Sequence, residues 1–68
     1  MRLSIRNQLP GTVAEIEQRG VLSVVKVDLD GGQRVIASIT NDAVADLGLA
    51  PGRVTVLVKS TEVSLAVD

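Results

Sequence analysis

Two short clusters of polar residues hold the hydrogen-bond donors with which this chain could do chemistry. The first presents a hydroxyl, a guanidinium and two amides from Ser4, Arg6, Asn7 and Gln8. The second presents an ammonium and two hydroxyls in the run Lys59-Ser60-Thr61. Neither cluster contains a carboxylate, so both suit an oxyanion, whose oxygens accept hydrogen bonds and whose charge a Lys or Arg offsets. A solvated strand edge is the alternative interpretation of each cluster.

The composition of the 68-residue chain excludes most other kinds of site. The sequence contains no His, Cys, Phe, Trp or Tyr. Without His or Cys we expect no zinc, haem or iron–sulfur site, no thiol nucleophile and no disulfide. We therefore expect no catalytic residues, no metal bound as a bare cation and no enzymatic activity. The net charge of −1 and the lack of aromatic rings argue against a basic groove that stacks nucleic-acid bases.

Length and hydropathy predict one small domain over residues 1–68. Uninterrupted apolar stretches are short, and the N-terminus lacks the apolar core of a signal peptide, so we expect a cytoplasmic protein with no membrane contact. Twelve Val, eight Leu and four Ile are many branched side chains for one small core. Because no disulfide or metal supports that core, we expect the chain to form an oligomer whose partners cover the surplus.

Alternation of apolar and polar residues predicts a chain made mostly of strands. The predicted strands cover residues 2–6, 12–17, 21–29, 34–39, 54–59 and 62–67. We expect Pro10-Gly11 to end or bend the first strand, and Asp30-Gly31-Gly32 to form a hairpin turn. In the second strand, simple alternation places Val13 on one face and Ile16 on the other.

One short helix interrupts this pattern, with Thr40 or Asn41 as its N-cap and Gly48 as its C-terminal stop. The elements predict an all-β fold with one short helix, a small Greek-key β-barrel of the oligonucleotide/oligosaccharide-binding (OB) type, in oligomeric form. An SH3-like barrel is the near alternative. Several apolar residues would face outward, which favours an oligomer. They are Leu22, Val24, Ile36 and Leu57.

Four motifs in a fixed order resemble the molybdate-binding Mop, or molbindin, family. They are Ser4-x-Arg6-Asn7-Gln8-Leu9-x-Gly11-x-Val13, then Asp30-Gly31-Gly32 with Ile39-Thr40-Asn41, then Leu47-Gly48-Leu49-x-x-Gly52, then Val58-Lys59-Ser60-Thr61-x-Val63. The match runs over essentially the whole chain. The same domain occurs in molybdate-responsive regulators and molybdate-transporter ATPases. The small family members are cytoplasmic hexamers, described as trimers of dimers, around bound molybdate or tungstate.

The resemblance implies a single Mop/TOBE-like domain that binds molybdate or tungstate reversibly at subunit interfaces, without another cofactor. The ligands that it implies at those interfaces are Ser4, Arg6, Lys59 and Ser60, with Thr40 supplied by a neighbouring chain and Asn7 and Gln8 serving a second class of site near a symmetry axis. The implied role is intracellular molybdenum storage or homeostasis in a homo-hexamer.

Two departures from the family pattern bear on the implied site. Ala43 stands where many relatives carry a serine, and the segment between Gly52 and Lys59 is one residue shorter than usual. Two alternatives remain open at this point. An OB-type barrel also serves single-stranded nucleic-acid binding, and a purely structural oligomerisation module would use the polar clusters for interface hydrogen bonds alone.

Overall fold

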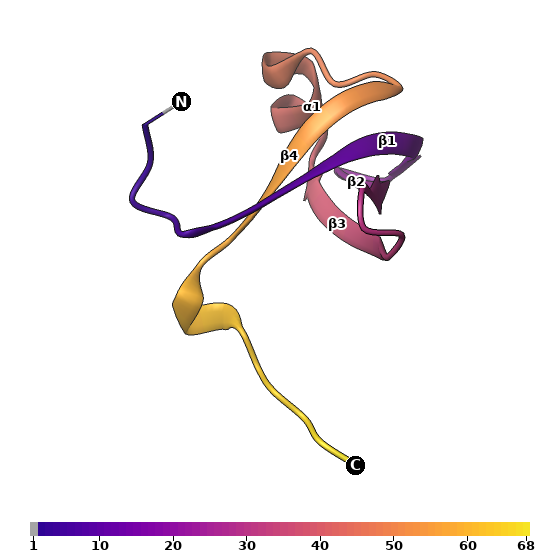
Figure 1. The fold of residues 1–68 in the computed structure, drawn as a ribbon. Coiled ribbons are helices and arrows are strands. Elements are labelled where there is room, and N and C mark those ends of the chain that lie inside the picture. Colours follow the sequence, from indigo (N-terminus) through magenta and orange to yellow (C-terminus); the bar gives the residue numbers. More distant parts are fainter. Residues whose placement is uncertain (1) are drawn as a thin grey trace.

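In the computed structural model, which describes residues 2–68, four strands form one antiparallel sheet. The elements are β1 (Asn7–Arg19), β2 (Leu22–Leu29), β3 (Arg34–Thr40), α1 (Asn41–Leu47), β4 (Gly52–Val58) and the 3-10 turn η1 (Ser60–Glu62). The strands lie in the order β3-β2-β1-β4 (Figure 1). The predicted class, mostly strands with one short helix, is therefore confirmed.

Strand β1 continues through Pro10 and Gly11, where the sequence predicted an end or a bend. Pro10 pairs with Thr55 of β4, and its carbonyl accepts a hydrogen bond from the Asp30 N–H at 3.0 Å. Gly11 is buried, and a Cβ there would lie only 2.8 Å from the Asp28 carbonyl oxygen and 2.9 Å from Val27 Cγ1. The glycine lets two backbones approach closely within one long strand instead of separating two short ones.

A β-bulge decides which residues of β1 face the core. The pairing with β2 shifts between Val13 and Glu15, so that Val13 lies opposite Val27 and Ile16 lies opposite Val25. The extra residue reverses the alternation, and Val13 and Ile16 both pack into the core. The prediction that they occupy opposite faces was wrong for this reason.

The hairpin and the helix follow their predicted signals. Strands β2 and β3 pair from Leu22 with Thr40 to Asp28 with Arg34, across the predicted turn. At the start of α1, Thr40 Oγ1 accepts a hydrogen bond from the Ala43 N–H at 3.0 Å. At its end, Gly48 adopts the left-handed conformation with φ 61° and donates to the Ala45 carbonyl. These are the expected N-cap and C-cap.

The two predicted terminal strands, residues 2–6 and 62–67, are not strands within the single chain. A strand needs a hydrogen-bonded neighbour, and alternation of side chains does not supply one. Figure 1 shows both terminal segments running away from the sheet. The apolar residues of the last segment are accordingly open to solvent, with Val63, Leu65 and Val67 being 47%, 93% and 97% exposed.

The core is small, and the inner face of the sheet is only partly covered. Val13, Val25 and Val27 are the buried apolar residues among those described. An apolar groove of about 320 Å³ opens beside them. It is lined by Val13, Val25, Val27, Ala37, Ile39, Leu47, Leu49, Val54, Thr55, Val56 and Leu57. Of the residues expected to face outward, Leu22, Ile36 and Leu57 are exposed and Val24 is half-buried.

Candidate functional site

One hollow of about 220 Å³ gathers residues from both polar clusters. The residues that line it are Ser4, Ile5, Arg6, Lys59, Ser60 and Thr61. The pairing of β1 with β4 explains why they meet, since Asn7 lies opposite Val58 at the end of this antiparallel ladder. The segment before Asn7 and the segment after Val58 therefore leave the sheet at the same place.

The two amides of the first cluster bind backbone beside the hollow. Asn7 Nδ2 donates to the Val58 carbonyl at 3.1 Å, which ties the start of β1 to the end of β4. Gln8 Nε2 donates to the Ile5 carbonyl at 2.9 Å. The predicted cluster is thus divided, because Ser4 and Arg6 line the hollow whereas Asn7 and Gln8 hold the backbone that flanks it.

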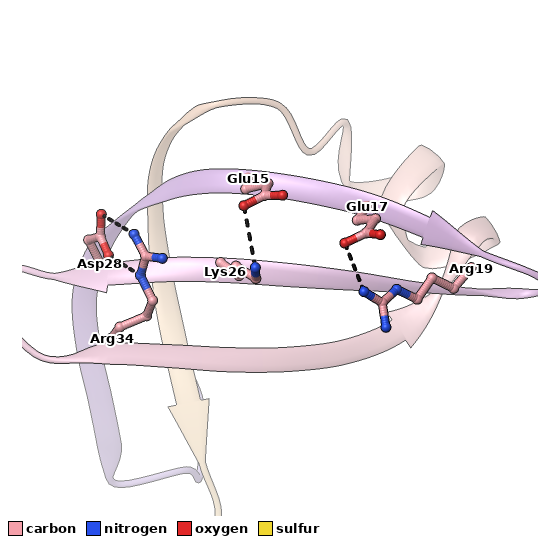
Figure 2. Close-up of polar contacts among 6 residues, drawn as sticks. All are labelled: Glu15, Glu17, Arg19, Lys26, Asp28 and Arg34. Atoms are coloured by element: carbon pink, nitrogen blue, oxygen red, sulfur yellow. Dashed lines mark hydrogen bonds and ion pairs between the residues drawn. The ribbon is translucent and has the colours of Figure 1, made fainter.

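The positive charges of the chain fall into two sets. Of the seven Lys and Arg residues, four form ion pairs with carboxylates. These pairs are Arg19–Glu17 at 3.1 Å, Lys26–Glu15 at 3.5 Å, Arg34–Asp28 at 2.7 Å and Arg53–Asp30 at 2.7 Å, and Figure 2 shows the first three. Arg2, Arg6 and Lys59 form no ion pair within residues 2–68. Two of these three unpaired cations line the hollow.

The ion pairs of Arg34 and Arg53 favour the ionised form of their carboxylate partners. Hydrogen bonds from Arg34 lower the pKa of Asp28, and hydrogen bonds from Arg53 lower the pKa of Asp30. The Arg53 contact is bidentate, with Nη1 and Nη2 at 2.7 and 2.8 Å from the two carboxylate oxygens of Asp30. An external anion at either guanidinium would have to displace a carboxylate, whereas Arg6 and Lys59 need no such exchange.

Thr40 does not join this hollow within one chain. It lines a separate hollow of about 260 Å³ together with Gly20, Val21, Asn41 and Asp42. Its Oγ1 accepts the Ala43 N–H, and the hydroxyl hydrogen is left to donate elsewhere. Position 43 itself adds no hydroxyl to this region, as the sequence indicated.

The first hollow also includes a hydroxyl that the implied ligand set left out. Thr61 lines it beside Ser60, at the start of the 3-10 turn η1. The sequence indicated Thr61 only by its position in the run Lys59-Ser60-Thr61, which offers a cation and two hydroxyls. Together the side chains offer three hydroxyls, a guanidinium and an ammonium, with no carboxylate among the lining residues. Such a set has the donors and the charge to bind an anion by charge-assisted hydrogen bonds, and it contains no paired acid and base.

Cation sites and membrane-spanning helices are not found in residues 2–68. No group of three or more His, Cys, Asp or Glu side chains in that range could hold a metal ion. No helix in the same range has the length and apolar character needed to cross a membrane.

Comparison with known proteins places the chain among molybdenum-related proteins. The family model of the TOBE domain matches residues 3–65. The molybdenum transport protein ModE of Herbaspirillum seropedicae is 46% identical over 67 residues, which are 97% of this chain and 25% of ModE. The molybdenum-pterin-binding protein 3 of Clostridium pasteurianum is 36% identical over 66 residues, 96% of this chain and 97% of that protein. The chain therefore spans about a quarter of some relatives and nearly all of others.

Solved structures agree with this placement. A molybdate-binding protein from Sporomusa ovata superposes with a TM-score of 0.89 at 45% identity, covering 97% of this chain and 98% of that one. The cytoplasmic molybdate-binding protein ModG, with molybdate bound, superposes with a TM-score of 0.80 at 43% identity, covering 88% of this chain and 43% of ModG. These likenesses confirm the predicted fold as a small β-rich domain of the OB type.

Proposed function

The chain belongs to the TOBE domain family and to its Mop, or molbindin, group, and on that premise we propose that residues 1–68 form one domain that binds molybdate reversibly. The anion occupies the hollow between the two polar clusters, with Ser4, Arg6, Lys59 and Ser60 as its ligands. Tungstate, a tetrahedral dianion like molybdate, binds in the same place. The role is one of binding, without catalysis.

The observation that carries the proposal is the distribution of unpaired positive charge. In a chain with net charge −1, four of the seven cations are neutralised by carboxylates, and two of the remaining three line one hollow with three hydroxyls. A tetrahedral dianion needs hydrogen-bond donors on several sides together with partial neutralisation of its charge. The lining residues offer both.

We propose further that the anion lies at a subunit interface of a homo-oligomer, as a hexamer built from dimers. The apolar groove of about 320 Å³ and the exposed last segment are surfaces that a second copy would cover. Thr40, which is apart from the hollow in its own chain, then reaches the anion of a neighbouring chain. Asn7 and Gln8 serve a second class of anion site near a symmetry axis.

We place this binding in intracellular molybdenum storage and homeostasis, in the cytoplasm. The location is supported by the structural relative ModG, which is a cytoplasmic molybdate-binding protein. An anion that bridges subunits stabilises the assembly by mass action, so thermal stability rises with molybdate concentration. Binding of single-stranded nucleic acid has less support, because the chain contains no aromatic residue for base stacking and four of its cations are paired with carboxylates.

Calorimetric titration with molybdate tests the site. Arg6→Ala and Lys59→Ala each remove a charged donor worth about 1.5–3 kcal/mol, so we expect the affinity to fall by about tenfold or more. Arg2→Ala is the matched control, because it removes an unpaired cation from the same segment without touching the hollow. Wild-type affinity in both site variants, or an equal loss in the control, would contradict the proposed position of the anion.

Native mass spectrometry with and without molybdate tests the assembly. We expect hexamers that carry bound anions. The apolar groove favours one rival, a structural oligomerisation module, which would show hexamers but no heat on titration with molybdate, tungstate or sulfate. A monomer in both conditions would contradict the interface proposal.

A further inference from the structure

Ser23 is the one polar side chain that is buried in residues 2–68, with 3% of its surface exposed. It lies on the inner face of β2, in alternation with the buried Val25 and Val27. A hydroxyl in such a place is costly unless it is hydrogen-bonded. Ser23 Oγ donates to Asn41 Oδ1 at 2.6 Å, which satisfies it.

Asn41, the first residue of α1, makes three hydrogen bonds that hold the start of the helix against the sheet. Its Oδ1 accepts from Ser23, its Nδ2 donates to the Gly20 carbonyl at 2.8 Å, and its backbone N–H donates to the Val21 carbonyl at 3.1 Å. Gly20 and Val21 form the turn between β1 and β2. The network therefore joins β2, this turn and the helix start at one point.

Apolar packing of α1 against the sheet is too limited to fix the position of the helix by itself. The helix is seven residues long and contains no buried residue. A helix of two turns is not stable by itself, so its place on the sheet depends on tertiary contacts. The Ser23–Asn41 network is the polar contact at its N-terminal end, directly beside Thr40.

We propose that Ser23 and Asn41 are positioning residues for the anion site. They hold Thr40 beside the Gly20–Val21 turn, with which it lines one hollow. The Thr40 oxygen accepts the Ala43 N–H, so its hydroxyl hydrogen is left to donate to the anion bound by a neighbouring chain. This inference rests on the proposed function. It explains why a hydroxyl stands on an inner face whose other buried side chains are those of valines.

Ser23→Thr and Ser23→Val form the matched pair that tests this role. The two side chains have the same shape and suit a strand equally, but only threonine keeps the hydroxyl. In calorimetric titration of the folded protein with molybdate, we expect Ser23→Thr to bind with close to wild-type affinity. We expect Ser23→Val to bind about tenfold more weakly, because it removes one of the three hydrogen bonds by which Asn41 fixes the helix start beside Thr40. If either branched residue prevents folding, Ser23→Ala against wild type makes the same comparison.

Three results would overturn the inference while wild-type protein binds molybdate. The first is equal affinity of Ser23→Val and wild type, even if the valine variant melts at a different temperature. The second is an equal loss in Ser23→Thr, since the hydroxyl would then not be the cause. The third is a loss of affinity that accompanies loss of the assembly in native mass spectrometry, which would give the network a role in assembly only. Failure of wild-type protein to bind molybdate would instead refute the proposed function itself.

Discussion

Arg6 and Lys59 differ from most basic residues of this chain in having no carboxylate beside them. An incoming anion thus gains their hydrogen bonds without first breaking an ion pair. At Arg53, by contrast, the anion would compete with both oxygens of Asp30, which already accept at 2.7 and 2.8 Å. The residues that suit an oxyanion are therefore selected by what surrounds them as much as by their type.

Gly11 is the residue at which one added carbon has the clearest expected effect on stability. In Gly11→Ala the new Cβ would meet the Asp28 carbonyl oxygen and Val27 within 3 Å, so the backbones of β1 and β2 must move apart. We expect a loss of about 1–3 kcal/mol in the free energy of unfolding, measured by urea denaturation. Gly31→Ala is the control, because its Cβ would meet only the flexible Gln33 side chain. A Gly11→Ala variant as stable as the control would refute the close approach.

At the scale of elements, the pairing of β1 with β4 assembles the candidate site. Its ladder runs from Asn7 with Val58 to Val13 with Gly52, and the two polar clusters lie just beyond its first pair. Asn7 reinforces that end by its side-chain bond to the Val58 carbonyl. The other end of β4 is tied to the β2–β3 turn by the Arg53–Asp30 ion pair.

The Arg53–Asp30 ion pair should make the stability of the fold depend on pH in the acid range. The pKa of Asp30 is lowered in the folded protein by Arg53, so the folded state keeps the carboxylate ionised at a lower pH than the unfolded state does. The stabilisation is complete above the unfolded pKa of about 3.9 and disappears as the pH falls through the lowered folded value. In thermal unfolding followed by circular dichroism, wild type should melt above Asp30→Asn at pH 7, and the difference should shrink as the pH is lowered below about 4. A difference that stays constant over this range would show that Asp30 does not act through its charge.

At the scale of the whole molecule, the chain leaves apolar surface that one copy does not cover. The inner groove lies open beside a core of three valines, and Leu65 and Val67 are almost fully exposed. A chain of this length buries only a modest fraction of its surface on folding, so the exposed apolar area leaves a single copy with low stability. In the proposed assembly, a second copy that covers both surfaces would complete the core and bring another chain to the proposed anion site.

Leu65→Asp tests whether the last segment takes part in assembly. Burial of a leucine side chain contributes about 1.5–3 kcal/mol, so a charge at this position should shift the equilibrium strongly from the proposed hexamer toward smaller species in native mass spectrometry. Ser64→Asp is the matched control, since it adds the same charge to the adjacent exposed position of the segment. Assembly of Leu65→Asp like wild type, or equal disruption by both variants, would exclude Leu65 from the interface.

Much of this protein could be predicted from local patterns in the chain. The hairpin at Asp30-Gly31-Gly32, the helix between Thr40 and Gly48, and the donor-rich character of the two clusters all depend on residues close in sequence. Turn chemistry, capping and hydrogen-bonding capacity are local properties, so neighbouring residues are enough to determine them. The absence of His, Cys and aromatic rings is a matter of composition alone, and it restricts the chemistry open to the chain whatever its fold.

Tertiary structure decided the features that depend on contacts between distant residues. Only the register of β1 against β2 shows the bulge that turns Val13 and Ile16 to the same side, and only the approach of the two backbones at Gly11 explains why β1 does not break there. The meeting of Ser4 and Arg6 with Lys59 and Ser60 likewise depends on a ladder that joins residues about fifty positions apart. Alternation along a chain reports which side chains prefer water, but pairing decides which strands exist, which faces they present and which polar groups share a hollow.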